Sequence, residues 1–100
     1  MSKDEKRVQT RHPDPTKSMP VIDGWRYDAV RKAILSAVPK TGDGLLFKEL
    51  PGRFRDLLGP ESLEGLGSVS WYTTTVKLDL EPRGELKRVP GARPQRLLRC

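Results

Sequence analysis

The chain has 100 residues, of which 35% are hydrophobic, and its 19 Lys and Arg outnumber its 13 Asp and Glu to give a net charge of +6. This length allows one small domain with a small core and leaves little room for the deep pocket of an enzyme. The excess of positive charge favours polyanionic partners such as nucleic acids. No stretch of about 18 apolar residues is present, so we expect no membrane segment and a cytoplasmic location.

One cysteine, Cys100, and one histidine, His12, restrict the chemistry further. A single cysteine excludes an internal disulfide and fits a reducing compartment. A structural zinc site needs more Cys and His ligands than the chain has. The sequence also contains no GxxxxGK[ST], HExxH or GxSxG motif. It therefore predicts a protein that is not an enzyme and that uses neither a metal nor a cofactor.

Residues 1–20 are rich in charge, Pro, Ser and Thr and nearly lack apolar side chains. Such a segment cannot bury enough surface to fold, so we expect a disordered N-terminal arm. Its basic residues could follow a phosphate backbone, as homeodomain arms do, while a solvated tail is the simpler interpretation. Residues 21–100 are expected to form the domain. Val21 and Ile22 open it, either as a short edge strand or as a staple for the following helix.

Apolar residues at helical spacing predict a first helix over residues 25–38, ended by Pro39. Residues 45–47 then form a short apolar run that suits a strand. A second helix is predicted from about Leu50 to residue 58, because Pro51 is tolerated only in a first turn and Gly59 follows. The buried stripes predicted for the two helices are Tyr27, Val30, Ile34, Leu35 and Val38, and then Leu50, Phe54, Leu57 and Leu58.

A third helix is predicted over residues 68–83, after a segment, 61–67, that is too short and glycine-rich for a helix to be predicted. Ser68 or Ser70 can cap its first turn. Gly84 supplies the left-handed residue that often follows a helix, and Pro82 predicts a frayed or kinked last turn. The core face should hold Val69, Tyr72, Val76 and Leu80, with Thr73 beside them.

Two other groups of side chains on this helix point to function. Ser70, Thr74, Lys77 and Glu81 form a polar stripe, which is the natural surface for DNA contacts. Trp71 and Leu78 lie together on the side away from the core face. They either pack on residues 61–67 or 21–22, or they mark a protein interface.

The C-terminal part is predicted to be a basic hairpin, with strands at 85–89 and 95–99 around a Pro-Gly-rich turn. From residue 83 to residue 100 there are six basic residues and one acid, which accounts for +5 of the net +6. This concentration of charge fits a nucleic-acid binder. The alternative is that the basic residues only discourage edge-to-edge aggregation of the strands.

Residues 71–99, together with HPDP at 12–15, YDAV at 27–30 and LFKEL at 46–50, resemble a family of small uncharacterised bacterial proteins with a winged helix-turn-helix-like fold. The resemblance spans residues 11–99. The pattern Val76, Leu80, Gly84, Leu86 is also similar to the end of recognition helices in winged-helix transcription regulators, from which Pro82 departs. The resemblance implies that residues of the third helix face the major groove and that arginines of the hairpin lie on or beside the wing.

We therefore expect an α+β winged helix, with a three-helix core, a short strand after the first helix and a C-terminal two-stranded hairpin as the wing. The expected function is binding of double-stranded DNA, as in transcription regulation, by a monomer or weak dimer. The alternative is a protein-interaction module that uses Trp71, Leu78 and the hairpin edge. The predicted DNA-binding residues are Ser70, Thr73, Thr74, Lys77, Lys87, Arg88, Arg93 and Arg96.

Overall fold

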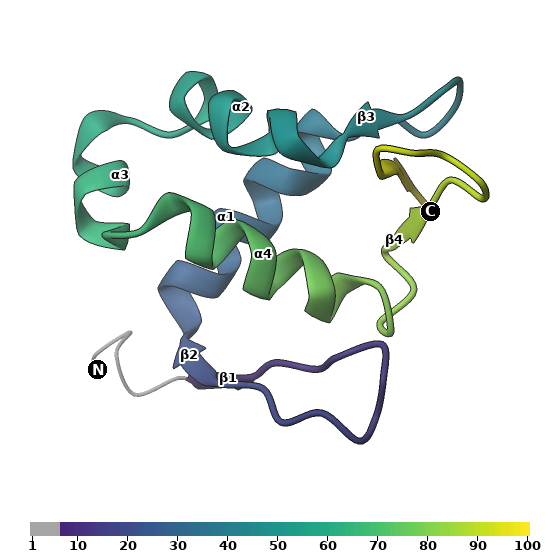
Figure 1. Ribbon diagram of the computed structural model, residues 1–100. Helices are drawn as coiled ribbons and strands as arrows, with labels where there is room; N and C mark the ends of the chain where they lie inside the picture. The colour runs from purple at the N-terminus through teal and green to yellow at the C-terminus, as the bar shows by residue number, and fades with distance from the viewer. Residues whose placement is uncertain (1–6) are drawn as a thin grey trace.

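The computed structural model describes residues 7–100, without the side chains of Arg55, Ser62, Leu63 and Leu66 (Figure 1). Its architecture is α+β, with helices around one core and two small antiparallel sheets. The elements follow the order β1 (Arg7–Gln9), β2 (Val21–Asp23), α1 (Gly24–Ala37), β3 (Leu45–Leu46), the 3-10 helix η2 (Phe47–Glu49), α2 (Leu50–Leu57), α3 (Pro60–Leu66), α4 (Val69–Leu80), β4 (Leu86–Arg88) and β5 (Arg96–Arg99).

The core lies where α1, α2 and α4 meet. Ile34 of α1, Phe54 of α2 and Val76 of α4 are inaccessible to solvent. Figure 1 shows α4 crossing on the near side of α1, with α2 above it. The stripe predicted for the first helix is confirmed, although Leu35 is only partly buried. Leu57 was predicted to be buried but is 48% exposed, because α2 ends there and the chain turns to an extended conformation at Leu58.

The larger sheet has the strand order β3-β5-β4, so the last strand of the chain lies in the middle. Leu45 pairs with Leu97 on one side of β5, and Leu86 pairs with Arg99 on the other. The three leucines are buried and join the sheet to the helical core. The predicted hairpin and the short strand after the first helix are confirmed. The pairing of β3 with β5, which places the last strand in the middle of the sheet, could not be read from the periodicity of either segment.

Residues 7–20 correct the expectation of a disordered arm, while residues 1–6 lie outside the described part. β1 pairs with β2, with Val8 opposite Ile22, so that residues 21–23 form a strand, the first of the two alternatives. Polar groups complete the hairpin: the Thr10 amide donates to the carbonyl of Pro20 at 3.2 Å, and Gln9 Nε2 donates to the carbonyl of Met19 at 2.8 Å. Composition alone does not predict that this segment is ordered, because its order comes from hydrogen bonds and from pairing with β2.

The segment from residue 60 to residue 80 forms two helices, where one was predicted. α3 occupies the segment for which no helix was predicted, and Pro60 in its first turn has a backbone angle that suits a helix start. Ser68 is the N-cap of α4, since its Oγ accepts a hydrogen bond from the Trp71 amide at 3.2 Å. α4 ends at Leu80 rather than residue 83, because Pro82 cannot donate a helical hydrogen bond. Within the described part, no helix is long and apolar enough to cross a membrane.

Candidate nucleic-acid interface

The solvent-facing side of α4 is built from hydroxyl groups and one indole. Ser70, Trp71 and Thr74 are exposed, and Leu78 is partly buried beside them. Trp71 is 45% exposed, and its ring meets that of Tyr72 edge-on at a centroid distance of 4.8 Å. The Trp71 ring thus remains open to solvent. The tryptophan that lies against α3 is Trp25, because a Cβ added to Gly65 of α3 would be 3.2 Å from the Trp25 ring.

Thr73 is not part of this exposed side, in contrast to the predicted groove contact. It is 1% exposed, and its Oγ1 donates to the carbonyl of Val69 one turn earlier at 2.7 Å. The hydroxyl of a threonine in a helix commonly donates a hydrogen bond to the carbonyl four residues earlier. Thr73 therefore belongs to the core face, beside which the helical spacing also placed it.

Lys77 is the one basic residue of α4, and it too is withdrawn from solvent. The residue is 2% exposed, and its ammonium lies 2.8 Å from Glu81 Oε2 and 5.0 Å above the centre of the Phe47 ring. Burial lowers the pKa of Lys77, and the hydrogen bond to Glu81 opposes that shift. The structure therefore removes Lys77 from the predicted contact surface, because η2 brings Phe47 over it.

Arg88 of β4 binds the same carboxylate, since its Nε lies 2.6 Å from Glu81 Oε1. Arg88 Nη2 also donates to Glu81 Oε2 at 3.3 Å, the oxygen that pairs with Lys77, so this one carboxylate binds both cations. Two of the predicted DNA-binding residues are brought together around an acid: Lys77 is buried there, whereas Arg88 stays exposed. The resulting cluster of Lys77, Glu81 and Arg88, which we call the Glu81 clamp, ties the hairpin to the C-terminal end of α4.

The remaining basic residues of the hairpin divide into exposed and anchored side chains. Lys87 and Arg93 are exposed, and neither has an acidic partner among the described residues. Arg96 is partly buried and donates to the carbonyl of Gly44 at 3.1 Å. Arg99 donates to the carbonyl of Val38 at 3.3 Å. Lys87 and Arg93 are therefore open to solvent, as their predicted role requires, whereas Arg96 holds β5 to the turn before β3.

A buried carboxylate, which the sequence reasoning did not single out, fixes the position of α4. Asp79 is 0% exposed; its Oδ1 accepts from the backbone amide of Arg11 at 2.8 Å, and its Oδ2 accepts from the Tyr27 hydroxyl and from Arg83 Nε at 2.7 Å. Burial and the Asp79 contact raise the pKa of Tyr27. The only signal in the sequence was an acidic residue between two leucines.

This arrangement offers hydroxyl and indole donors on α4 and, on the hairpin, two exposed cations that have no acidic partner among the described residues. Such groups can contact phosphates and base edges without making or breaking covalent bonds. Within residues 7–100, no group of three or more His, Cys, Asp or Glu is placed to hold a metal ion.

A family model described as "Family of unknown function (DUF6958)" matches residues 7–97. The matched range contains the β1–β2 hairpin, all of the helices in the described part and most of the three-stranded sheet. No curated protein and no solved structure matches the chain.

Proposed function

The chain belongs to this family of unknown function, and we propose that it is a winged-helix protein that binds double-stranded DNA. In this proposal α4 is the recognition helix and the hairpin of β4 and β5 is the wing. The order α1, β3, α2, α4, β4, β5, with β3 beside β5, supports the assignment, since a helix followed by a two-stranded basic hairpin is how winged modules meet DNA. α3 takes the place of the usual short turn.

The observation that carries the proposal is the placement of Lys87 and Arg93. Both are exposed on the hairpin, without acidic partners among the described residues, and the Glu81 clamp ties that hairpin to α4. Exposed cations on the hairpin can neutralise phosphates beside a groove that α4 enters. The fold by itself would not justify the assignment, because winged helices also serve in protein contacts.

The contact surface differs from the one that the sequence predicted. Ser70, Trp71 and Thr74 are the exposed groups of α4, so the helix offers hydroxyls and the indole N–H rather than a lysine. None of these groups reads a base with the two parallel hydrogen bonds that Arg or Asn can make. We therefore expect modest sequence preference, with affinity supplied mainly by contacts to the DNA backbone.

Fluorescence anisotropy with a labelled random-sequence duplex, measured at several salt concentrations with reductant present, tests the proposal. Each cation that meets a phosphate contributes about −0.9 to the slope of log affinity against log salt, so Lys87 and Arg93 together contribute about −2. We expect micromolar affinity at low salt that weakens with this slope or a steeper one. No binding at low salt would reject the proposal.

The exposed Trp71 favours a second candidate, in which α4 docks a protein partner through Trp71 and Leu78. An indole that is 45% exposed is a common centre of protein interfaces. The Trp25→Phe variant leaves Trp71 as the only tryptophan, so its fluorescence reports on this face alone. Quenching of this fluorescence by duplex DNA supports the DNA-binding proposal. Unchanged Trp71 fluorescence at saturating DNA would show that this face of α4 does not contact DNA.

As a DNA-binding protein, the chain would act in the cytoplasm, in a role such as transcription regulation, as a monomer or weak dimer and without catalysis. The measured oligomeric state decides how long a DNA site it covers, because a dimer of winged helices spans two half-sites. Analytical ultracentrifugation with reductant present tests this part of the proposal, since the exposed Cys100 can form disulfide-linked dimers on oxidation. A stable reduced dimer would contradict it.

A further inference from the structure

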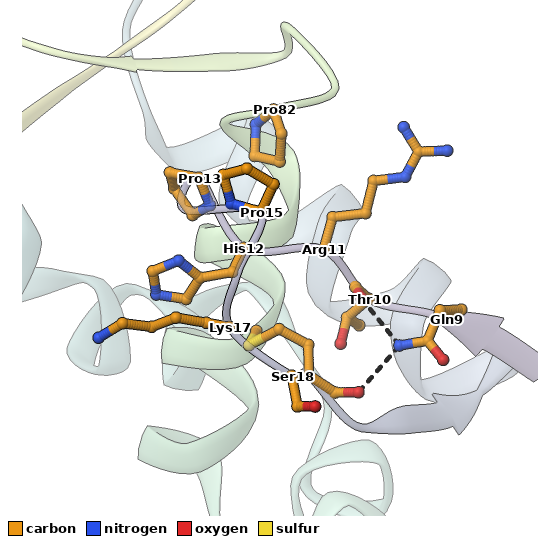
Figure 2. Close-up of a pocket in the computed structure, with 10 residues that line it drawn as sticks. Gln9, Thr10, Arg11, His12, Pro13, Pro15, Lys17, Ser18 and Pro82 are labelled. Atoms are coloured by element: carbon orange, nitrogen blue, oxygen red, sulfur yellow. Dashed lines mark hydrogen bonds between the residues drawn. The ribbon is translucent and has the colours of Figure 1, made fainter.

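A pocket of about 540 Å³ opens in the loop that connects β1 to β2. Its volume lies within the roughly 300–1,000 Å³ of small-molecule sites. Pro82, which follows α4, closes one side, so the pocket joins the N-terminal loop to the end of the proposed recognition helix (Figure 2). Its lining includes His12, Pro13, Pro15, Lys17 and Pro82.

Hydrogen bonds fix the wall of this pocket before any ligand binds. Gln9 Nε2 bridges the carbonyls of Thr10 and Met19, at 3.0 Å and 2.8 Å, across the mouth of the loop (Figure 2). Asp14 Oδ1 accepts from the amide and the hydroxyl of Thr16, at 3.0 Å and 2.7 Å, and these bonds lower the pKa of Asp14. The one carboxylate of the loop is therefore bound within its own turn. A preformed wall reduces the entropic cost of binding a ligand.

The pocket combines an apolar wall with cationic and hydrogen-bond donor groups. Figure 2 shows the rings of Pro13, Pro15 and Pro82 gathered at one end, with the side chains of His12 and Lys17 extending to one side below them. The three proline rings form an exposed apolar surface, and Lys17 is exposed without an acidic partner among the described residues.

His12 has a defined role in this geometry. Its Nδ1 accepts a hydrogen bond from the amide of Asp14 at 2.9 Å. The neutral ring must then carry its proton on Nε2, which makes the outer nitrogen a donor. His12 and Lys17 can thus both donate to one anionic group, while Arg11 points to the other side of the loop in Figure 2.

We propose that this pocket binds a small phosphate monoester whose organic part is a flat apolar ring. The phosphate would accept from Lys17 Nζ and His12 Nε2, and the ring would lie against the three prolines. A phosphate supplies the several acceptor oxygens that two donors require, and charge-assisted bonds of this kind are the stronger ones. This proposal does not depend on the DNA-binding proposal, because the phosphate would not contact the exposed residues of α4 or the basic residues of the β4–β5 hairpin.

The test is a titration of the full chain with phenyl phosphate, followed by amide resonances in NMR spectra. We expect saturable shifts in the 10–19 loop with a dissociation constant on the order of 1 mM, and about tenfold weaker binding by Lys17→Gln. Lys32→Gln removes the same charge from the exposed surface of α1 and should leave the affinity unchanged. Phenol, which has the ring without the phosphate, should not saturate the loop.

Three results would overturn the proposal. Unshifted loop resonances would show that the pocket takes no phosphate monoester. An equal loss of affinity in Lys17→Gln and Lys32→Gln would reduce the binding to general attraction by a basic chain. Loop shifts that arise with duplex DNA but not with phenyl phosphate would assign the loop to the DNA backbone instead of to a small ligand.

Discussion

The hydroxyl of Tyr27 on α1 donates a hydrogen bond to Oδ2 of Asp79 on α4, with both side chains buried. An ionised carboxylate is costly to bury unless its hydrogen-bond partners are complete. Rotation of α4 about its axis would take Asp79 away from Tyr27 and from the Arg11 amide together. The pair therefore determines which side of α4 faces solvent.

Asp79→Asn should lower the free energy of unfolding by about 2–4 kcal/mol. The amide lacks the negative charge that pairs with Arg83, and its NH₂ group would face other hydrogen-bond donors. Urea denaturation followed by circular dichroism measures the change. Asp43→Asn, in the exposed turn before β3, is the matched control and should change little. Equal effects of the two substitutions would contradict the role of Asp79.

The stability that Tyr27 contributes should disappear at alkaline pH. Burial first, and then the bond to Asp79, raise the pKa of Tyr27 above its ordinary value of 10.0. Above pH 10 the unfolded chain releases the phenol proton while the folded chain keeps it, so this contribution is complete below pH 10 and is lost as the pH rises further.

The measurement compares the wild-type protein with Tyr27→Phe by urea denaturation from about pH 9 to about pH 11. The wild-type advantage should shrink by up to about 1.4 kcal/mol per pH unit above pH 10. Lys77, whose pKa is lowered by burial, titrates in both proteins and cancels from the difference. A difference that stays constant with pH would contradict the raised pKa.

Glu81→Gln should destabilise the fold by about 1–3 kcal/mol, since it leaves the buried Lys77 ammonium without its counterion. Adding Lys77→Met should recover most of the loss, because a thioether suits the space beside Phe47. Thermal unfolding of the single and double variants measures both effects. If the double variant is as unstable as Glu81→Gln alone, the loss of stability comes from the broken ion pair with Arg88 and not from the unpaired Lys77 ammonium.

Gly44→Ala should be more destabilising than Gly42→Ala, although both glycines have a positive φ, of 84° and 90°. A Cβ on Gly44 would lie 2.7 Å from the backbone carbonyl oxygen of Leu97, whereas a Cβ on Gly42 meets nothing within 4 Å. Strain at φ alone costs roughly 1 kcal/mol, and the contact with β5 adds to it only at residue 44. Equal losses in urea denaturation would exclude a close approach of this turn to β5.

Lys87→Gln and Arg93→Gln should each make the salt dependence of DNA affinity shallower by about 0.9, and should weaken all duplex sequences alike. Lys77→Met should leave the slope unchanged, because its ammonium is already paired with Glu81. The anisotropy titrations described above provide the slopes. If Lys77→Met makes the salt dependence as shallow as Lys87→Gln does, Lys77 contacts DNA phosphate in the complex.

The helices of the core could be predicted because their information is local. Tyr27, Val30 and Ile34 recur at helical spacing, and Pro39 and Gly59 mark ends that the backbone itself imposes. The hairpin was found in the same way, from two short strand-like runs around a turn rich in Pro and Gly. In each case the predicted end differs from the observed one by at most three residues.

The features that the sequence did not reveal depend on residues far apart in the chain. β1 exists because residues 7–9 find residues 21–23, and α3 packs beside α4 after a proline start. Lys77 looked like a surface cation, but its burial follows from Phe47 and Glu81. Of the predicted DNA-contact residues, Ser70, Thr74, Lys87, Arg88 and Arg93 are exposed, Arg96 is partly buried, and Thr73 and Lys77 are buried. That the exposed ones contact DNA stays a prediction.

The central position of β5 also bears on how the molecule is made. β3 and β4 are separated by β5 and pair with it alone in their sheet. A ribosome that has released the chain only as far as residue 95 has exposed the two outer strands without the one that joins them. The helices can collapse at that stage, but the sheet can close only when residues 96–99 leave the exit tunnel.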